Sequence, residues 1–188
     1  NHLMELLSED IPTLVSLMHV NNETGTVLDL KEIATICKQH SVYFHSDTVQ
    51  SIGKMELDLK EIPLDFAVAS AHKFHGPKGI GFVFVRKGNA LRPIFHGGEQ
   101  EKGARPGTES LHNIVGMAKA LQLSYENLES DRNHIEALKK YTIRQLQHHF
   151  PDVKFNGTDD KTFYTILNAR LPLDASKSGM LLFNLDMK

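Results

Sequence analysis

The chain has 188 residues, of which 40% are hydrophobic and 23% are charged, and its formal net charge is −2 at pH 7. This is the composition of a globular protein, with enough chain for one compact domain or for a domain and part of another. The small net charge does not point to nucleic acid or an anionic membrane as a partner, and no apolar run approaches the roughly 20 residues of a membrane span.

The first two thirds of the chain alternate strand-like and helix-like stretches. Short apolar runs predict strands at residues 14–20, 42–45, 66–69 and 81–85. Residues 21–29 contain Gly25 and are predicted to form a loop, and helical spacing predicts a helix over residues 30–40. Because strands alternate with helices, the expected fold class is α/β, with a mostly parallel sheet whose strands are joined by crossovers through flanking helices.

A loop rich in glycine and charge follows at residues 96–108. Helical spacing then runs from near Leu111 to about Phe150, where Pro151 ends it. A continuous helix of about 40 residues would span about 60 Å, so it is expected to link two domains. Strands predicted at residues 153–155 and 164–169, and a helix at 176–185, indicate the start of a second α+β domain.

Two domains are therefore expected: residues 1–125 as part of a large α/β domain, and residues 126–188 as the end of the long helix with part of a small C-terminal domain. The chain starts at Asn1 without a methionine and stops just after an apolar segment, which suggests a piece of a longer protein. Its only cysteine, Cys37, excludes an internal disulfide framework and fits a reducing cytoplasm. Cys37 falls on the apolar face of the helix predicted at residues 30–40, so core packing is expected for it.

Polar side chains follow three of the predicted strands. Asn22 comes after the first strand, Asp47 after the second, and Ser70, His72 and Lys73 after the third. In open α/β sheets, ligands bind outside the carboxyl ends of the strands. Successive members of the set Asn22, Asp47 and Lys73 are separated by about one strand–helix unit, so the sheet is expected to bring them to one edge.

This set of side chains suits pyridoxal 5′-phosphate (PLP) better than hydrolysis, because it contains no convincing set of nucleophile, base and orienting residue. The amine of Lys73 can form a Schiff base with the aldehyde of PLP, and the carboxylate of Asp47 can keep the pyridine nitrogen protonated. The hydroxyl of Ser70 and the imidazole of His72 can bind the phosphate. Residue types alone leave simpler interpretations open: Lys73 as a solvated surface lysine, Asp47 as a helix N-cap, and residues 70–73 as an ordinary turn.

Five short sequence motifs resemble those of a known family. They are HVNNETG (residues 19–25), HSDTVQSIGK (45–54), SAHKFHGPKGIG (70–81), HGGEQE (96–101) and RPGT (105–108). In their order and approximate spacing they resemble the cysteine desulfurases of the nitrogen-fixation and iron–sulfur-cluster type, within the class V aminotransferases. The match runs from near residue 14 to near residue 120 and continues more weakly to the end of the chain.

The resemblance implies a fold-type I PLP enzyme that works as a homodimer. Its substrate would be L-cysteine, which it would convert to L-alanine while an enzyme cysteine takes the sulfur as a persulfide. Lys73 would be the Schiff-base lysine and later a proton shuttle, and Asp47 would pair with the pyridinium nitrogen. Gln50 would hydrogen-bond the phenolic oxygen of the cofactor.

The resemblance also assigns the remaining cofactor contacts. Asn22 would lie beside the ring and the substrate carboxylate, and Ser70 and His72 would bind the phosphate. Thr108 would reach the phosphate in the neighbouring subunit. The family's persulfide cysteine, its ring-stacking histidine and its substrate-binding arginine have no counterpart in this chain, so the isolated chain is expected to lack desulfurase activity.

Alternatives within the same fold are a selenocysteine lyase and a class V aminotransferase, and a non-catalytic PLP-fold scaffold is an alternative of another class. The asparagine pair at residues 21–22 and the HGPKG motif at 75–79 favour the desulfurases. A desulfurase would pass its sulfur to an acceptor scaffold protein for iron–sulfur cluster or thiocofactor assembly. The presence of Lys73, Asp47 and Gln50 together argues against a non-catalytic scaffold, which has no physical need to keep all three. No metal site is expected, because the histidines of the long helical stretch lack a carboxylate-backed set.

Overall fold

The computed structural model describes residues 2–9, 11–157 and 162–187, with the backbone alone at residues 175–177. The chain divides into two compact units. The first consists of Asn1–Asn21 and Val27–Asp131, and the second of Asn22–Thr26 and Arg132–Lys188. Among the residues described, no helix combines the length and the apolar character that crossing a membrane requires.

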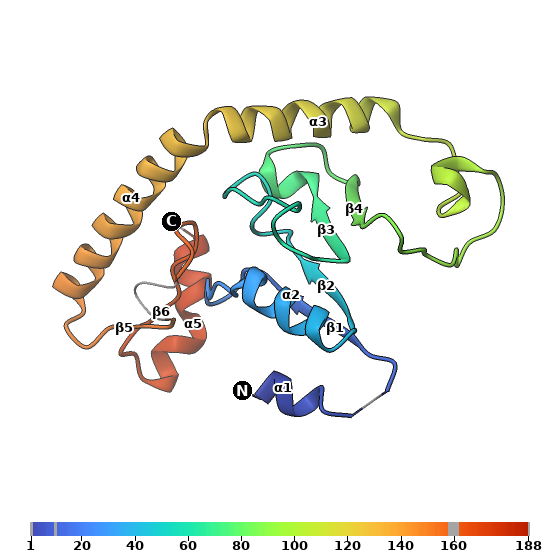
Figure 1. The fold of residues 1–188 in the computed structure, drawn as a ribbon. Helices are drawn as coiled ribbons and strands as arrows, with labels where there is room; N and C mark the ends of the chain where they lie inside the picture. Colours follow the sequence, from blue (N-terminus) through green and yellow to red (C-terminus); the bar gives the residue numbers. More distant parts are fainter. Residues whose placement is uncertain (1, 10, 158–161, 188) are drawn as a thin grey trace. The chain divides into compact units, whose positions relative to one another are not determined.

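A four-stranded sheet forms the centre of the first unit (Figure 1). Its strands, in spatial order, are β1 (Leu14–Met18), β2 (Tyr43–Asp47), β3 (Phe66–Ser70) and β4 (Gly81–Val85). The first three strands are parallel, whereas β4 runs antiparallel to β3. The expected α/β class with a mostly parallel sheet is confirmed.

Strand β4 is the antiparallel member of this mostly parallel sheet, and the length of the connection before it gives the reason. The segment between Ser70 and Gly81 is fully described and holds one regular element, the 3₁₀ helix η1 (Ala71–Phe74). A parallel connection needs a dozen or more residues, usually with an α-helix. The short segment therefore returns the chain as an antiparallel strand.

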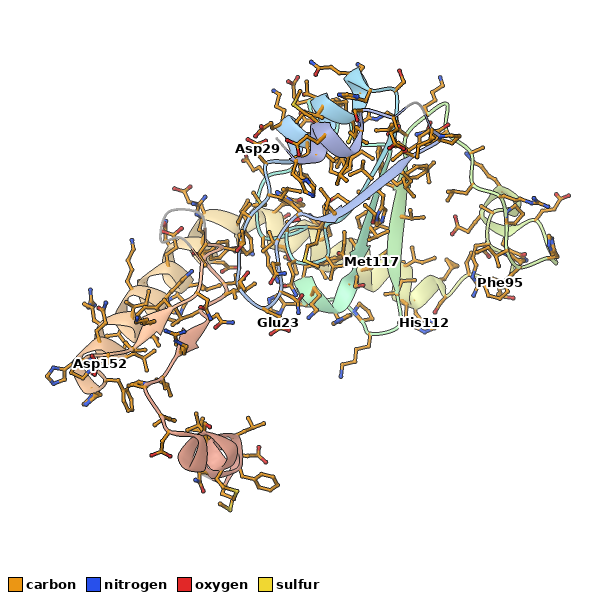
Figure 2. The ribbon with its side chains drawn as sticks, turned by 90° about the horizontal axis from the view of Figure 1, so that it is seen from below. Glu23, Asp29, Phe95, His112, Met117 and Asp152 are labelled. Atoms are coloured by element: carbon orange, nitrogen blue, oxygen red, sulfur yellow. The ribbon has the colours of Figure 1, made fainter. Side chains whose placement is uncertain are left out.

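Helix α2 (Leu30–Gln39) packs against this sheet and forms the main core with it. Oδ1 of Asp29 caps the helix by accepting the backbone N–H of Glu32 at 2.9 Å (Figure 2). The buried residues of this core are Leu7, Val15, Leu30, Ala34, Ile36, Cys37, Phe44, Leu64 and Ala67. Cys37 is 1% exposed, which confirms the core position expected for its thiol.

A second apolar cluster lies around the end of β3 and the elements that follow β2 and β3. Its buried members are Ile52, Ala69, Ala71 and Phe74, and α3 (Leu111–Glu126) packs on it through residues such as Met117, which is labelled in Figure 2. The cluster joins the turn that follows β2 to helix η1, so the two loops that leave the sheet edge are packed together.

The helical stretch predicted from Leu111 to Phe150 forms two helices rather than one. Helix α3 ends at Glu126, and α4 (Leu128–His149) begins two residues later. At the break, Asn127 donates both its backbone N–H, at 3.1 Å, and its side-chain Nδ2, at 2.8 Å, to the carbonyl oxygen of Leu123. Asn127 itself leaves the helical conformation, with φ −103° and ψ 5°, and asparagine favours helix ends because its side chain bonds nearby backbone groups.

The second unit contains a small antiparallel pair, β5 (Lys154–Phe155) with β6 (Ala169–Arg170), and helix α5 (Ala175–Asp186). The strand predicted at residues 153–155 and the helix at 176–185 are confirmed. The strand predicted at 164–169 is wrong, because the backbone N–H of Ile166 donates to the carbonyl of Phe163 at 3.1 Å and closes a turn. Phe163 and Tyr164 are 5% and 9% exposed. Apolar residues occur here because the side chains are buried, and not because the backbone forms a strand.

Besides η1, two short helices are not expected from the sequence. Helix α1 (His2–Leu6) precedes the sheet, and the 3₁₀ helix η2 (Gln100–Gly103) lies in the glycine-rich loop between β4 and α3. Both are about one turn long, which is too short for a periodic apolar pattern to show.

Candidate active site

The carboxyl ends of β1, β2 and β3 meet at one edge of the sheet. The strand register pairs Met18 with Asp47, and Asp47 with Val68. Ser70 ends β3 two residues after Val68, and η1, which carries Lys73, follows directly. Asp47 and Lys73 therefore belong to the same edge of the sheet.

A tight turn follows Asp47, where the simplest interpretation of the sequence would place a helix N-cap. Oδ1 of Asp47 accepts the backbone N–H of Val49 at 2.9 Å, and the carboxyl group stays exposed at the sheet edge. The next residue, Thr48, is fully buried and donates both its backbone N–H, at 3.1 Å, and its hydroxyl, at 2.7 Å, to the carbonyl of Val68. These bonds tie the turn to the neighbouring strand β3.

A buried histidine supports this turn from the side of β1. The backbone N–H of His19 donates to the carbonyl of Asp47 at 2.9 Å, and its ring Nδ1 lies 2.9 Å from Oγ of Ser51. Oγ of Ser51 in turn lies 3.1 Å from the carbonyl oxygen of Thr48. Burial lowers the pKa of His19 to about 4, against an opposing attraction from Asp29, so the ring is neutral at pH 7.

His19 is not among the predicted site residues, although it begins the HVNNETG motif at residues 19–25. Its position, directly after an apolar strand and before the asparagine pair, was the only signal. A lone histidine at such a place gives no indication of its partner, because Ser51 comes 32 residues later in the chain.

Helix η1 holds Lys73 half-buried at the same edge. The neighbouring Phe74 is 1% exposed and anchors the helix in the second apolar cluster. Gly53, in the turn after β2, has φ +76°, and a Cβ there would lie 2.8 Å from Cβ of Phe74. This close approach locks the Asp47 turn against the helix that carries the lysine.

Lys54 is a second cation at this edge, and it too was missed from the sequence. Its Nζ donates to Oε1 of Gln50 at 3.4 Å. Burial, and after it the positive charge of Lys73, lower the pKa of Lys54. Gln50, Lys54 and Lys73 are all half-buried, and the two lysines are close enough to influence each other electrostatically.

The remaining predicted residues fall into two groups. Ser70 is half-buried at the end of β3, and His72 is exposed on η1 beside Lys73, so both lie at the edge already described. Asn22 belongs to the second unit, where its Nδ2 donates to Oε1 of Glu23 at 2.9 Å. The structure does not place Asn22 relative to Lys73.

Thr108 is exposed in the loop between η2 and α3, and no contact in this unit brings it to Asp47 or Lys73 among the residues described. In the same loop, the guanidinium carbon of Arg105 lies 5.3 Å from the ring centroid of Phe95, whose side chain is labelled in Figure 2. Figure 1 shows this yellow-green loop extending away from the sheet of its own unit.

The donor set of the sheet edge fits the groups that PLP presents, namely an aldehyde, a ring nitrogen, a phenolic oxygen and a phosphate. Lys73 supplies an amine, Asp47 an exposed carboxylate and Gln50 an amide. Ser70 and His72 supply a hydroxyl and an imidazole on either side of Ala71, next to the lysine. When bound, PLP supplies an electron-withdrawing ring that stabilises negative charge on the α carbon of an amino acid.

Comparison with known proteins agrees with this chemistry. The model of the class-V aminotransferase family matches residues 1–174. The cysteine desulfurase IscS of Clostridium botulinum is 39% identical over 178 residues, which are 95% of this chain and 45% of that protein. The cysteine desulfurase IscS of Buchnera aphidicola is 45% identical over 141 residues, which are 74% of this chain and 35% of that protein.

Solved structures give the same result. A NifS-like protein from Rickettsia africae superposes with a TM-score of 0.90 and 31% identity, over 98% of this chain and 51% of that one. DndA from Streptomyces lividans superposes with a TM-score of 0.84 and 33% identity, over 97% of this chain and 52% of that one.

The fold is thus that of a NifS-like, fold-type I PLP enzyme. More particularly, the chain belongs to the class-V aminotransferase family. Class-V aminotransferases and the cysteine desulfurases to which this chain is similar depend on PLP. The chain spans less than half the length of the two curated relatives and about half the length of the solved ones.

Proposed function

We propose that this protein acts as a cysteine desulfurase. The reaction moves the sulfur of L-cysteine to an enzyme thiol, giving an enzyme persulfide and L-alanine. The observation that carries the proposal is the shared sheet edge, where Asp47 at the end of β2 and Lys73 on η1 flank the turn with Gln50. The relatives named cysteine desulfurase, at 39% and 45% identity, support the same reaction.

Three residues of the edge have the central roles in this proposal. Lys73 would hold the cofactor covalently, and once the amino group of cysteine had replaced it, its free amine would accept the proton that leaves the α carbon. The carboxylate of Asp47 pairs with the protonated ring nitrogen, which keeps the ring electron-withdrawing. Gln50 donates a hydrogen bond to the phenolic oxygen.

Four further residues complete the proposed site. Ser70 and His72 bind the phosphate beside Lys73, and their positions at the end of β3 and on η1 support this. Asn22 contacts the ring and the substrate carboxylate. Thr108, exposed in its extended loop, reaches the phosphate of the neighbouring subunit in a homodimer.

Cys37 is not the sulfur acceptor. It is 1% exposed in the main core, and burial raises the pKa of its thiol, so the nucleophilic thiolate is disfavoured. Because Cys37 is the only cysteine of the 188 residues, this chain alone would hold no competent acceptor and would not turn over cysteine. The accepting thiol is assigned to the part of the relatives' length that this chain does not cover.

We also propose the domains, the compartment, the oligomeric state and the sulfur acceptor for this reaction. Residues 1–125 form part of the PLP-binding large domain, and residues 126–188 form the end of the linking helical stretch with part of the small domain. The protein works in the cytoplasm as a homodimer, and it passes sulfur to a scaffold protein for iron–sulfur cluster or thiocofactor assembly. The buried free thiol of Cys37 supports a reducing compartment.

The test uses the full-length protein with PLP, L-cysteine and dithiothreitol, and measures sulfide and alanine together. Equal amounts of both products are expected, and Lys73→Ala should lower the rate by at least about a hundredfold because the amine is lost. Lys78→Ala, which removes an exposed lysine of the same loop, should leave the rate unchanged within about twofold.

Other outcomes would replace the proposal with a specific alternative. Turnover of selenocysteine without turnover of cysteine would indicate a selenocysteine lyase. Transfer of the amino group to a keto acid would indicate an aminotransferase. Tight PLP binding without release of any product would indicate a non-catalytic scaffold.

A further inference from the structure

We propose that Lys54 positions Gln50, so that the NH₂ end of the Gln50 amide, and not its carbonyl end, faces the cofactor. This inference rests on the proposed function and deepens it, because it explains how one specific contact to the phenolic oxygen is oriented. Lys54 is thereby a positioning residue that acts through Gln50.

The side chains of Lys54 and Gln50 are in direct contact. Nζ of Lys54 lies 3.4 Å from Oε1 of Gln50, and both side chains are half-buried in the turn that follows β2. A lysine ammonium group has three donors and no acceptor, so it can pair only with the carbonyl end of an amide. The planar amide must then turn its Nε2 donors away from Lys54.

This orientation decides what Gln50 can bind. A glutamine without a fixed partner can present either its carbonyl oxygen or its NH₂ group to a ligand. The carbonyl would repel an anionic oxygen, whereas the NH₂ group donates to it. With its carbonyl held by Lys54, Gln50 becomes a selective donor, which is what a phenolic oxygen requires.

The Lys54–Gln50 pair lies close to the lysine that is proposed to hold the cofactor. The positive charge of Lys73 lies near Lys54 and, after burial, is the second cause that lowers the pKa of Lys54. The orientation of the Gln50 amide is therefore fixed near the proposed Schiff-base lysine.

The fold fixes the starting point of the Lys54 side chain. The backbone N–H of Lys54 donates to the carbonyl of Ser51 at 3.0 Å, and the side chain of Ser51 is held by the buried ring of His19. The preceding residue, Gly53, is in contact range of Phe74 on η1. Lys54 is thus held by the same contacts that hold the turn and the lysine helix.

The experiment measures the dissociation constant of PLP from the full-length, dimeric protein by absorbance titration of the cofactor-free form. Lys54→Met is expected to weaken PLP binding about tenfold, the size of one hydrogen bond to a charged group. In a Gln50→Ala background the same change should weaken binding by no more than about twofold, because the residue through which Lys54 acts is gone. An equal loss in both backgrounds would overturn the inference.

A spectroscopic signature separates positioning from a general loss of structure. The visible absorption maximum of bound PLP responds to the hydrogen bond at its phenolic oxygen, so Gln50→Ala and Lys54→Met should shift it in the same direction. Lys54→Arg, which keeps donors toward the carbonyl, should retain the wild-type maximum and stay within about threefold in affinity. Failure of Lys54→Arg to rescue either quantity would also contradict the inference.

Lys119→Met is the matched control. Nζ of Lys119 lies 3.3 Å from Oε1 of Gln122 on the exposed surface of α3, so this variant breaks a similar lysine–glutamine pair away from the edge. It should change neither the affinity nor the absorption maximum. If the wild-type protein fails to bind PLP, both the proposed function and the inference are wrong. If the wild-type protein binds PLP normally but the affinity losses from Lys54→Met and Gln50→Ala simply add, only the inference is wrong.

Discussion

Nδ1 of His19 lies 2.9 Å from Oγ of Ser51, and both side chains are buried. This contact joins the end of β1 to the turn after β2, two segments that are far apart in the sequence. Because the backbone N–H of His19 also donates to the carbonyl of Asp47, one residue holds both ends of the turn that presents Asp47 and Gln50. The geometry of the candidate site therefore depends on a neutral histidine beneath it.

The first prediction concerns the effect of pH on stability through His19. Its pKa is lowered from 6.5 to about 4 in the folded state, first of all by burial. As the pH falls below 6.5, His19 becomes protonated in the unfolded chain, whereas in the folded chain it stays neutral until about pH 4. The free energy of unfolding therefore decreases between pH 6.5 and pH 4. Above pH 6.5 the effect is absent. The loss should reach about 2–3 kcal/mol.

Urea unfolding of the cofactor-free, full-length protein between pH 7 and pH 4 measures this effect. His19→Asn keeps a polar partner for Ser51 but removes the titrating group, so its stability should fall less over the same range. Exposed His2→Asn is the control and should follow the wild-type profile. Parallel pH profiles for His19→Asn and the wild type would show that His19 does not cause the loss.

The second prediction concerns Gly81, which pairs with Ser70 across β3 and β4. A Cβ at Gly81 would collide with the backbone carbonyl oxygen of Ala69, and a backbone atom cannot rotate away. Gly81→Ala should therefore lower the free energy of unfolding by about 3 kcal/mol, at the upper end of the cost of overpacking. Urea unfolding midpoints give the measurement.

Gly79→Ala in the same loop is the companion variant. Gly79 has φ +79°, but a Cβ there meets nothing within 4 Å, so only the backbone conformation is penalised. A loss of about 1 kcal/mol is expected. Equal losses for the two alanines would argue against the close approach of Gly81 to Ala69.

The third prediction concerns Arg86, whose guanidinium group binds the segment before β3. Its Nη2 donates to the carbonyls of Leu59, at 2.8 Å, and Ile62, at 2.7 Å, and its Nε donates to the carbonyl of Leu64. Arg86→Met would leave three carbonyls without this donor and should cost about 2–3 kcal/mol in unfolding free energy. The neighbouring exposed Lys87→Met should stay within about 0.5 kcal/mol, and a similar loss in both variants would refute the role of the guanidinium.

The fourth prediction concerns the reactivity of Cys37. Burial, and then the negative charge of Asp65, raise the pKa of its thiol, so iodoacetamide should alkylate the Cys37 peptide in the native full-length protein far more slowly than after unfolding in urea. Peptide-resolved mass spectrometry gives the rates. Cys37→Ala should retain desulfurase turnover within about twofold, and loss of turnover with an intact fold would reopen the assignment of the sulfur acceptor.

Much of the first unit could be predicted because its strands and helix α2 follow the local apolar pattern. The apolar runs that end near Met18, Asp47 and Ser70 became β1, β2 and β3, and Asp29 caps α2 where the apolar spacing begins. The polar residues at or shortly after the ends of these strands also correctly predicted that Asp47 and Lys73 share one edge of the sheet. The roles of these residues toward PLP remain predictions.

What the sequence could not provide depends on contacts between distant segments. The direction of β4 is set by a connection too short for a crossover, and the helix break falls at the single residue Asn127 within a continuous apolar pattern. The partners of His19 and Arg86 are reached only after folding, and the carbonyl partners of Arg86 carry no side-chain signal at all. Lys54 was overlooked because a lysine four residues after Gln50 in a turn has no distinctive spacing.

The most direct test of the account identifies the lysine that carries the cofactor. Full-length protein loaded with PLP would be reduced with borohydride, digested, and analysed by peptide mass spectrometry. We expect the reduced cofactor on Lys73, next to the edge that Asp47 shares, with only trace labelling elsewhere. Labelling that falls mainly on Lys54, Lys78 or any other lysine would contradict the assignment of this sheet edge as the PLP site.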